Sequence, residues 1–239
     1  MGELKTEGIV LRHADYKDAD RMLTLLTPDY GLISVSARGI RKQNAKLRFA
    51  AELFTYGSYV LSDRGGRYAL TGCSLINSFY PLREDIDKMC AASAMVEMAN
   101  YAGTQQPQFE LFELLRGCLY ALCGNSPKDM LALFSARLLN ISGYMPDFKH
   151  CLECGKPADC FLPGEGGICA GCAAKISGAG WIKQEKGTAD FIEGCVYSES
   201  ESFINEAAPA TVDNAFLILI RHIQLCFDHQ FKSAAYFIK

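Results

Sequence analysis

Two Cys-x-x-Cys pairs stand in the stretch CLECGKPADCFLPGEGGICAGC, residues 151–172, and the fourteen residues 155–168 separate them. Zinc binds four thiolates in a tetrahedron, and each such pair brings two sulfurs to one ion. The spacing predicts a structural Zn²⁺ in a knuckle, residues 151–176, that needs the metal to fold. The alternative is a knuckle without metal. The predicted ligands are Cys151, Cys154, Cys169 and Cys172; Cys160 and His150 are alternative ligands better explained as bystanders.

The four-cysteine set also argues against chemistry at the metal. A catalytic zinc keeps one position open for water or substrate, and four protein ligands leave none. We therefore expect the knuckle to stabilise the chain and the function to lie elsewhere.

The other cysteines fit a reducing compartment. The chain has 11 cysteines, an odd number, and its start, MGELKTEGIV, lacks the basic and apolar regions of a secretory signal. No apolar run approaches the roughly 18 residues of a membrane span. We expect reduced thiols and a cytoplasmic protein without a membrane partner.

Residues 1–80 show the alternation of short β-strands. Three strands are predicted before residue 38, with a turn at Pro28–Gly31, and two after residue 50, with a turn at Asp63–Gly66. Five short strands with one longer interval after the third favour a small barrel of the OB type, although an SH3-like barrel has a similar pattern.

From Pro81 onward the apolar period becomes helical. Three helices are predicted between residues 83 and 143, the third with Ser126 as N-cap and Gly143 at its end. Signals are weak over 177–205, and Thr211 is predicted to cap a last helix that reaches about Phe227. The fold class is thus α+β multidomain: an OB-type barrel (1–80), a helical domain (81–150), the inserted zinc knuckle (151–176) and a C-terminal part of the helical domain (177–239).

The charge is distributed unevenly between these parts. Residues 1–80 carry 11 Lys and Arg against 8 Asp and Glu, whereas residues 81–239 carry 13 against 19. Within ARGIRKQNAKLRF five cations fall in the eleven positions 38–48. Such a cluster is either a solvated loop or a contact surface for nucleic-acid phosphates. The predicted DNA-binding residues are Arg38, Arg41, Lys42, Lys46 and Arg48.

Aromatic residues follow this stretch in FTYGSY. Phe54, Tyr56 and Tyr59 are expected either to stack on the bases of a single strand, as aromatics of OB folds do, or to fill the barrel core. Core packing is the stronger of the two interpretations for a barrel strand.

The sequence offers little support for an enzymatic function. Asp15, Asp18 and Asp20 suggest a metal-dependent nuclease, but Lys17 and Arg21 are placed to neutralise a polar turn and no second acidic cluster matches. The four histidines are scattered along the chain and suggest no catalytic triad, and no glycine-rich phosphate-binding loop follows a strand. No catalytic residue is predicted.

Two stretches together resemble the RecO family of bacterial recombination mediators. They are EGIVLRHADYKDADRMLTLLTPDYGLISVSARGIRKQNAKLR near the start and FSARLLNISGYMPDFKHCLECG before the knuckle. The resemblance spans the whole chain and is weakest over residues 177–210. It implies an OB barrel, a helical bundle and a zinc knuckle, the same partition that the residue patterns predict.

The resemblance also implies a function without bond chemistry. Proteins of this family bind single- and double-stranded DNA, anneal complementary strands and, with the partner RecR, help a RecA-type recombinase replace single-stranded-DNA-binding protein. A nucleoid-associated place in the bacterial cytoplasm follows. The family's DNA contacts fall on the five cations named above, and its zinc ligands on the four cysteines.

The family further docks the acidic, Phe-ended tail of single-stranded-DNA-binding protein on its helical domain. Arg116 and Arg137, each in an apolar helix, either pair with that tail or are ordinary surface charges. A different class of function stays open: a zinc-stabilised scaffold for protein partners that does not bind nucleic acid itself.

Overall fold

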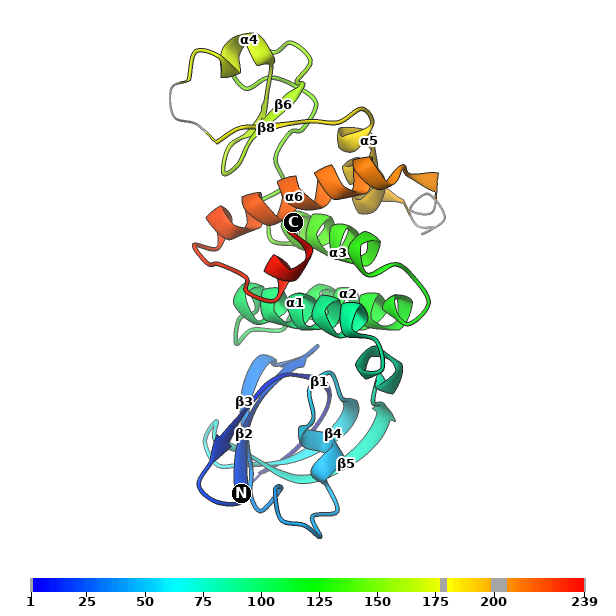
Figure 1. Cartoon of the computed structure of the whole chain (residues 1–239). Coiled ribbons are helices and arrows are strands. Elements are labelled where there is room, and N and C mark those ends of the chain that lie inside the picture. The colour runs from blue at the N-terminus through cyan, green and yellow to red at the C-terminus, as the bar shows by residue number, and fades with distance from the viewer. Residues whose placement is uncertain (1, 177–179, 199–205, 239) are drawn as a thin grey trace. The chain divides into compact units, whose positions relative to one another are not determined.

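A computed structural model describes residues 2–176, 180–198 and 206–238. The chain divides into two compact units, Met1–Gly124 and Asn125–Lys239 (Figure 1). The division falls inside the predicted helical domain, so that its first two helices group with the barrel. The predicted domain limits stay a prediction, because compactness does not test which part folds alone.

The first unit contains a closed five-stranded barrel, as predicted. Its strands follow the order β1-β2-β3-β5-β4, with β3 and β5 parallel and the other neighbours antiparallel. The strands are β1 (Gly2–Tyr16), β2 (Asp20–Thr27), β3 (Gly31–Ala37), β4 (Tyr56–Asp63) and β5 (Tyr68–Asn77).

Strand β1 closes the barrel because it is long enough to pair on both sides. Residues Gly2 to Ile9 pair with β4, whereas the part from Ile9 to Tyr16 pairs with β2. The register shifts between Val10 and Arg12, and such an irregularity bends a strand and increases its twist. This arrangement is that of an OB-type fold.

Alternate residues of these strands fill the barrel. Strand β3 alternates between buried and more exposed positions along nearly its whole length. The core consists of apolar residues from four strands and the segment that joins β3 to β4: Val10, Leu23, Leu25, Ile33, Val35, Ala37, Ile40, Ala50, Ala51, Tyr59 and Leu61.

Backbone hydrogen bonds hold the turn between β2 and β3 against residues 104–108. The Leu32 amide donates to the Thr104 carbonyl at 2.7 Å, and the Gln108 amide donates to the Pro28 carbonyl at 3.0 Å. Gly31 has a φ of +58°, and a Cβ there would lie 2.1 Å from the Gln106 carbonyl oxygen. Only glycine fits this close approach.

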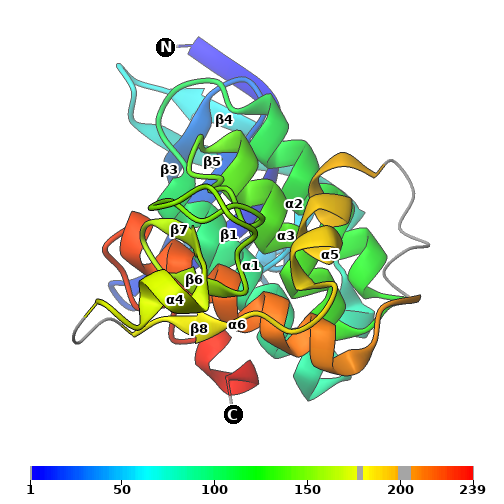
Figure 2. The same cartoon turned by 90° about the horizontal axis from the view of Figure 1, so that it is seen from above.

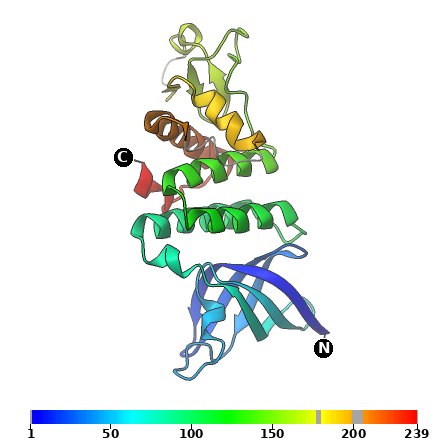
Figure 3. The same cartoon turned by 90° about the vertical axis from the view of Figure 1, so that its right-hand side faces the viewer.

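Two long helices complete the first unit and lie across one end of the barrel (Figure 3). They are α1 (Ile86–Ala102) and α2 (Phe109–Leu122), preceded by the short 3₁₀ turn η2 (Tyr80–Arg83). The Asp85 side chain caps α1 by accepting from the amides of Asp87 and Lys88. On α2, Phe112 packs edge-on against the ring of Tyr56, with centroids 6.0 Å apart.

The second unit is built on three helices that pack against one another: α3 (Pro127–Ile141), α5 (Thr188–Tyr197) and α6 (Pro209–Cys226). Ser126 and Gly143 flank α3 as predicted, and Gly143 has a φ of +73°. The prediction for the last helix was wrong by one turn. It begins at Pro209 after Ala208, and the Thr211 hydroxyl instead donates to the Lys186 carbonyl.

The knuckle adds a small sheet to this second unit (Figure 2). Strands β6 (Cys160–Leu162), β7 (Gly166–Ile168) and β8 (Ile182–Lys183) follow the order β7-β6-β8, and α4 (Ala170–Ala173) follows β7. The short turn η4 (Ala234–Phe237) lies near the end of the chain. No helix of the described ranges is long and apolar enough to cross a bilayer.

His222 joins α6 to this knuckle sheet. Its Nδ1 accepts from the Gly164 amide at 3.1 Å, so Nε2 carries the proton and donates to the Tyr144 carbonyl at 3.0 Å. The ring also lies edge-on to Phe161, with centroids 5.5 Å apart. A protonated ring cannot accept from Gly164, and burial lowers the pKa of His222.

We expect the second unit to lose stability in mild acid. In the unfolded chain, His222 binds a proton below a pKa of about 6.5, whereas the folded protein resists that proton. The free energy of unfolding therefore decreases as the pH is lowered. Thermal unfolding of wild type and His222→Gln between about pH 7.5 and 5.5 measures this. The wild type should lose more stability on acidification than His222→Gln, with His229→Gln behaving as wild type. An equal loss in all three contradicts the assignment.

Candidate functional site

The basic loop, residues 38–48, connects β3 to the 3₁₀ turn η1 (Arg48–Ala51) that precedes β4. All five of its cations are exposed. Four of them form no ion pair with any residue that the structure describes: Arg38, Lys42, Lys46 and Arg48. The loop thus presents unneutralised positive charge beside an OB barrel.

The loop is held in place by the turn between β1 and β2. The Gly39 amide donates to the Asp20 carboxylate at 2.7 Å, and the Arg41 amide donates to the Ala19 carbonyl at 2.9 Å. Inside the loop, the Lys42 amide donates to the Gly39 carbonyl. Ile40 is buried in the barrel core. These contacts place the cations on a fixed segment.

Arg41 differs from the other four cations. Its guanidinium pairs with Asp15 at 3.3 Å and donates to the carbonyls of Lys17 and Asp18. Its charge is therefore partly used to hold the loop. The sequence alone does not distinguish Arg41 from the other four cations, because its partners around the β1–β2 turn lie far away in the chain.

The acidic cluster, Asp15, Asp18 and Asp20, takes part in holding the basic loop. Arg21 donates to Asp15 at 2.9 Å, and this bond lowers the pKa of the Asp15 carboxyl. The carboxylate of Asp20 accepts from the loop, as described above. Among the described residues, only the four knuckle cysteines gather into a group with converging ligand atoms. The interpretation as a polar turn agrees with these contacts, with Arg41 in the role expected of Lys17.

The expected stacking surface is absent from the barrel strand. Phe54, Tyr56 and Tyr59 are 1%, 6% and 0% exposed. The Tyr59 hydroxyl donates to the Ala50 carbonyl at 3.1 Å, and the Tyr56 hydroxyl donates to Glu7. These buried rings cannot stack on bases, which excludes the stacking alternative. Tyr59 belongs to the barrel core, whereas Tyr56 packs against Phe112 of α2.

The knuckle brings the four predicted cysteine ligands together. The Sγ atoms of Cys151, Cys154, Cys169 and Cys172 all lie within 4.8 Å of one another, and those of Cys154 and Cys169 are 3.7 Å apart. Four soft sulfur donors at this spacing suit a tetrahedral metal ion such as zinc. The cluster can therefore bind a metal.

Electrostatics of the cluster also favour a cation. Backbone amides of Cys169, Cys154 and Glu153 donate to the Cys151 sulfur and lower the pKa of its thiol to about 6. Hydrogen bonds to the sulfurs of Cys169 and Cys154 raise the pKa of Cys172 to about 12. The first thiolate forms easily, whereas these hydrogen bonds hold the proton on Cys172, and ionising all four sulfurs would bring repelling negative charges together. A divalent cation at their centre reverses that repulsion.

The two alternative ligands lie outside the cluster. Cys160 is buried in the small knuckle core with Leu162, Ile168 and Ala173. His150 pairs with Asp147, Nδ1 to Oδ2 at 2.8 Å. Both contacts support the interpretation of Cys160 and His150 as bystanders.

The two helix arginines are occupied by neighbours. Arg137 donates to the carbonyls of Cys195 and Ser198 at 2.8 and 3.0 Å, where α5 ends, and so caps that helix. Arg116 pairs with Glu113 on its own helix. Arg137 is thus a cap of α5 and not an ordinary surface charge, whereas the pairing of Arg116 fits the interpretation as an ordinary surface charge.

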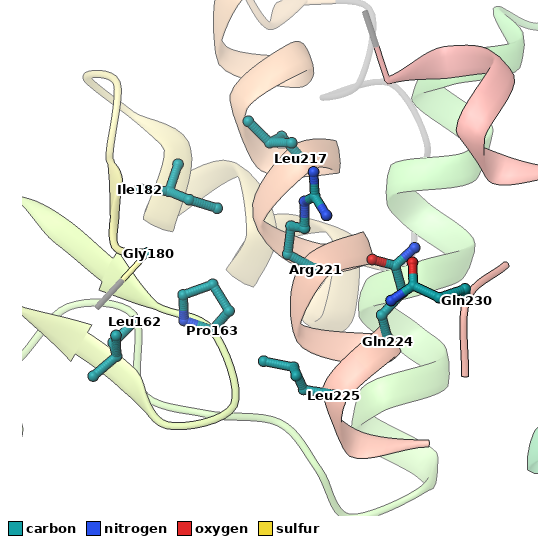
Figure 4. A pocket seen from close by; sticks show the side chains of 9 residues that line it. All are labelled: Leu162, Pro163, Gly180, Ile182, Leu217, Arg221, Gln224, Leu225 and Gln230. Atoms are coloured by element: carbon teal, nitrogen blue, oxygen red, sulfur yellow. The ribbon is translucent and has the colours of Figure 1, made fainter. Parts of the chain in front are cut away.

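A groove that sequence analysis missed lies in the second unit, between the knuckle sheet and α6 (Figure 4). It encloses about 540 Å³ and is lined mainly by apolar side chains, including Pro163, Ile182, Leu217 and Leu225. Arg221 stands between Leu217 and Leu225 on one face of α6, is exposed, and forms no ion pair within the described ranges. The only sequence signal was one cation in an apolar helix.

Known proteins are similar to this chain over most of its length. The family model for the N-terminal region of recombination protein O matches residues 1–79, and that for its C-terminal region matches residues 83–225. DNA repair protein RecO of Acetivibrio thermocellus is 30% identical over 94% of this chain and 92% of its own. RecO of Anaeromyxobacter sp. strain K is 37% identical over 74% and 73%, and that of Bacillus pumilus 33% over 72% and 69%.

Proposed function

Because this chain belongs to the RecO family of DNA repair and recombination proteins, we propose that it is a DNA-binding recombination mediator. The basic loop binds the phosphates of single- and double-stranded DNA. Complementary strands are annealed on it, and with RecR the protein helps a RecA-type recombinase replace single-stranded-DNA-binding protein. The observation that carries the proposal is the set of four exposed, unpaired cations on a fixed loop of an OB-type barrel.

Annealing needs no bond chemistry from these residues. Two backbones repel each other until cations displace their counterions, and the Lys and Arg side chains of the loop supply that neutralisation. Base pairing then supplies the free energy. The proposed metal is Zn²⁺, held by the four cysteines, which would stabilise the knuckle and leave no position for substrate.

Annealing of complementary oligonucleotides, with and without the coating protein, tests the mediator role. We expect the protein to speed duplex formation on bare strands and to relieve inhibition by the coating protein. Duplex formation at the spontaneous rate under both conditions contradicts the proposal.

The groove of the second unit is the proposed docking site for the acidic, aromatic-ended tail of single-stranded-DNA-binding protein. Its apolar walls suit an aromatic side chain, and the unpaired guanidinium of Arg221 suits a carboxylate. This combination favours the groove over Arg137, whose guanidinium is engaged with α5.

Reversing the charge of Arg221 should weaken tail binding by about tenfold or more, since a paired charge is replaced by a repulsive one. Fluorescence anisotropy with a labelled acidic peptide ending in Phe measures this for Arg221→Glu. Lys183→Glu is the matched control, because Lys183 is an exposed cation of the same unit outside the groove lining. Equal affinities of the two variants contradict the assignment.

A further inference from the structure

A hollow of about 250 Å³ is bounded by the two ends of the basic loop and by β5. One end contributes Arg38, Gly39 and Ile40 next to Ala37, the last residue of β3, and the other contributes Ala45, Lys46 and Leu47. Strand β5 adds Leu70. The hollow therefore lies within the segment that carries the exposed cations.

The hollow combines apolar walls with positive charge. Ala37 and Ile40 are 1% and 5% exposed, and Leu47 and Leu70 are partly buried against the barrel core. Arg38 and Lys46 are exposed, and the lining contains no acidic residue. These apolar and positively charged groups side by side suit a ligand that has an apolar surface with negative charge beside it.

One nucleotide of a flexible strand has both properties. Pockets for drug-sized ligands measure roughly 300–1,000 Å³, so this hollow suits a smaller group such as a single flat ring system. We propose that it receives one unstacked base of single-stranded DNA, while Arg38 and Lys46 neutralise the adjacent phosphates. The inference rests on the proposed DNA binding and specifies that the loop binds a base as well as phosphates.

The hollow would let the protein distinguish a single strand from a duplex. Phosphates are present in both and are more densely spaced on a duplex, so the cations alone do not favour a single strand. A base of a duplex is stacked and paired, and bringing it into the hollow costs unstacking and unpairing free energy. A single strand avoids most of that cost, and its unstacked bases are available.

Filling the hollow without changing the charge isolates this effect. Ala45→Trp places a ring in the hollow, whereas Asn44→Trp adds the same ring at the exposed neighbouring position outside the lining. Affinities for a single strand and for a duplex are compared at one salt concentration. We expect Ala45→Trp to lose about tenfold in single-strand affinity and to keep its duplex affinity, whereas Asn44→Trp should cause no loss of single-strand affinity.

An abasic oligonucleotide gives a second measurement, which needs no variant. It retains every phosphate, so the wild type should bind it about tenfold more weakly than the normal strand, while Ala45→Trp should bind both alike. The inference is overturned if the wild type does not discriminate, or if Ala45→Trp discriminates as well as the wild type does. Wild type that binds no normal strand at all instead refutes the proposed function.

Discussion

Replacing Arg38, Lys42 and Lys46 together with Ala should lower single-strand affinity by at least about tenfold and reduce the salt dependence of binding. Each phosphate contact on a single strand contributes about 0.7 to the slope of log K against log salt, so three lost contacts reduce the slope by about 2. These cations are chosen because they are exposed and unpaired, whereas Arg41 also anchors the loop. Anisotropy titrations between about 50 and 200 mM salt measure both quantities.

The matched control removes three exposed cations from the second unit. Lys156, Lys175 and Lys183 are exposed in the structure and lie outside the basic loop. Their replacement with Ala lowers the net charge by the same amount but should leave the slope nearly unchanged. An equal loss of slope in the two triple variants would show that binding responds to net charge and not to the loop.

Loss of one metal ligand should abolish metal binding and unfold the knuckle. Apparent binding free energies for structural zinc are about 10–16 kcal/mol in small zinc peptides. The knuckle core, in contrast, contains few apolar side chains. For Cys154→Ser, elemental analysis should find well under one metal ion per chain, and limited proteolysis should cut within residues 151–176.

The control for this experiment is Cys160→Ala, which removes a knuckle cysteine outside the ligand cluster. It should retain one metal ion per chain. Affinity for single-stranded DNA should be the same in wild type and Cys154→Ser, because the basic loop belongs to the first unit. A knuckle that resists protease equally after the metal is removed contradicts a structural role for the metal.

Local patterns predicted the parts of the fold that depend on local chemistry. The spacing of Cys151, Cys154, Cys169 and Cys172 was sufficient, since two tight turns can meet at one ion wherever the rest of the chain lies. Alternating side chains and glycine turns predicted the five strands of the barrel. The cations of the basic loop stood out because few acidic residues surround them in the sequence.

Tertiary contacts decided the features that sequence patterns did not predict. The sequence left Tyr59 compatible with base stacking or with the barrel core, and the closed barrel buries it. Arg137 resembled a surface charge, but its bonds run to carbonyls of a helix some sixty residues away. Helix α5 itself lies in a stretch with weak signals, where Gly187 with a φ of +84° begins a helix that packs on α3 and α6.

DNA binding by the basic loop is tested most directly by the affinity of the wild-type protein for a single-stranded oligonucleotide across a range of salt. We expect clear binding that weakens steeply as salt rises, with a slope that the triple replacement of Arg38, Lys42 and Lys46 reduces. Absence of binding at low salt, in protein that retains its metal and fold, would contradict it. That result would favour a zinc-stabilised scaffold for protein partners.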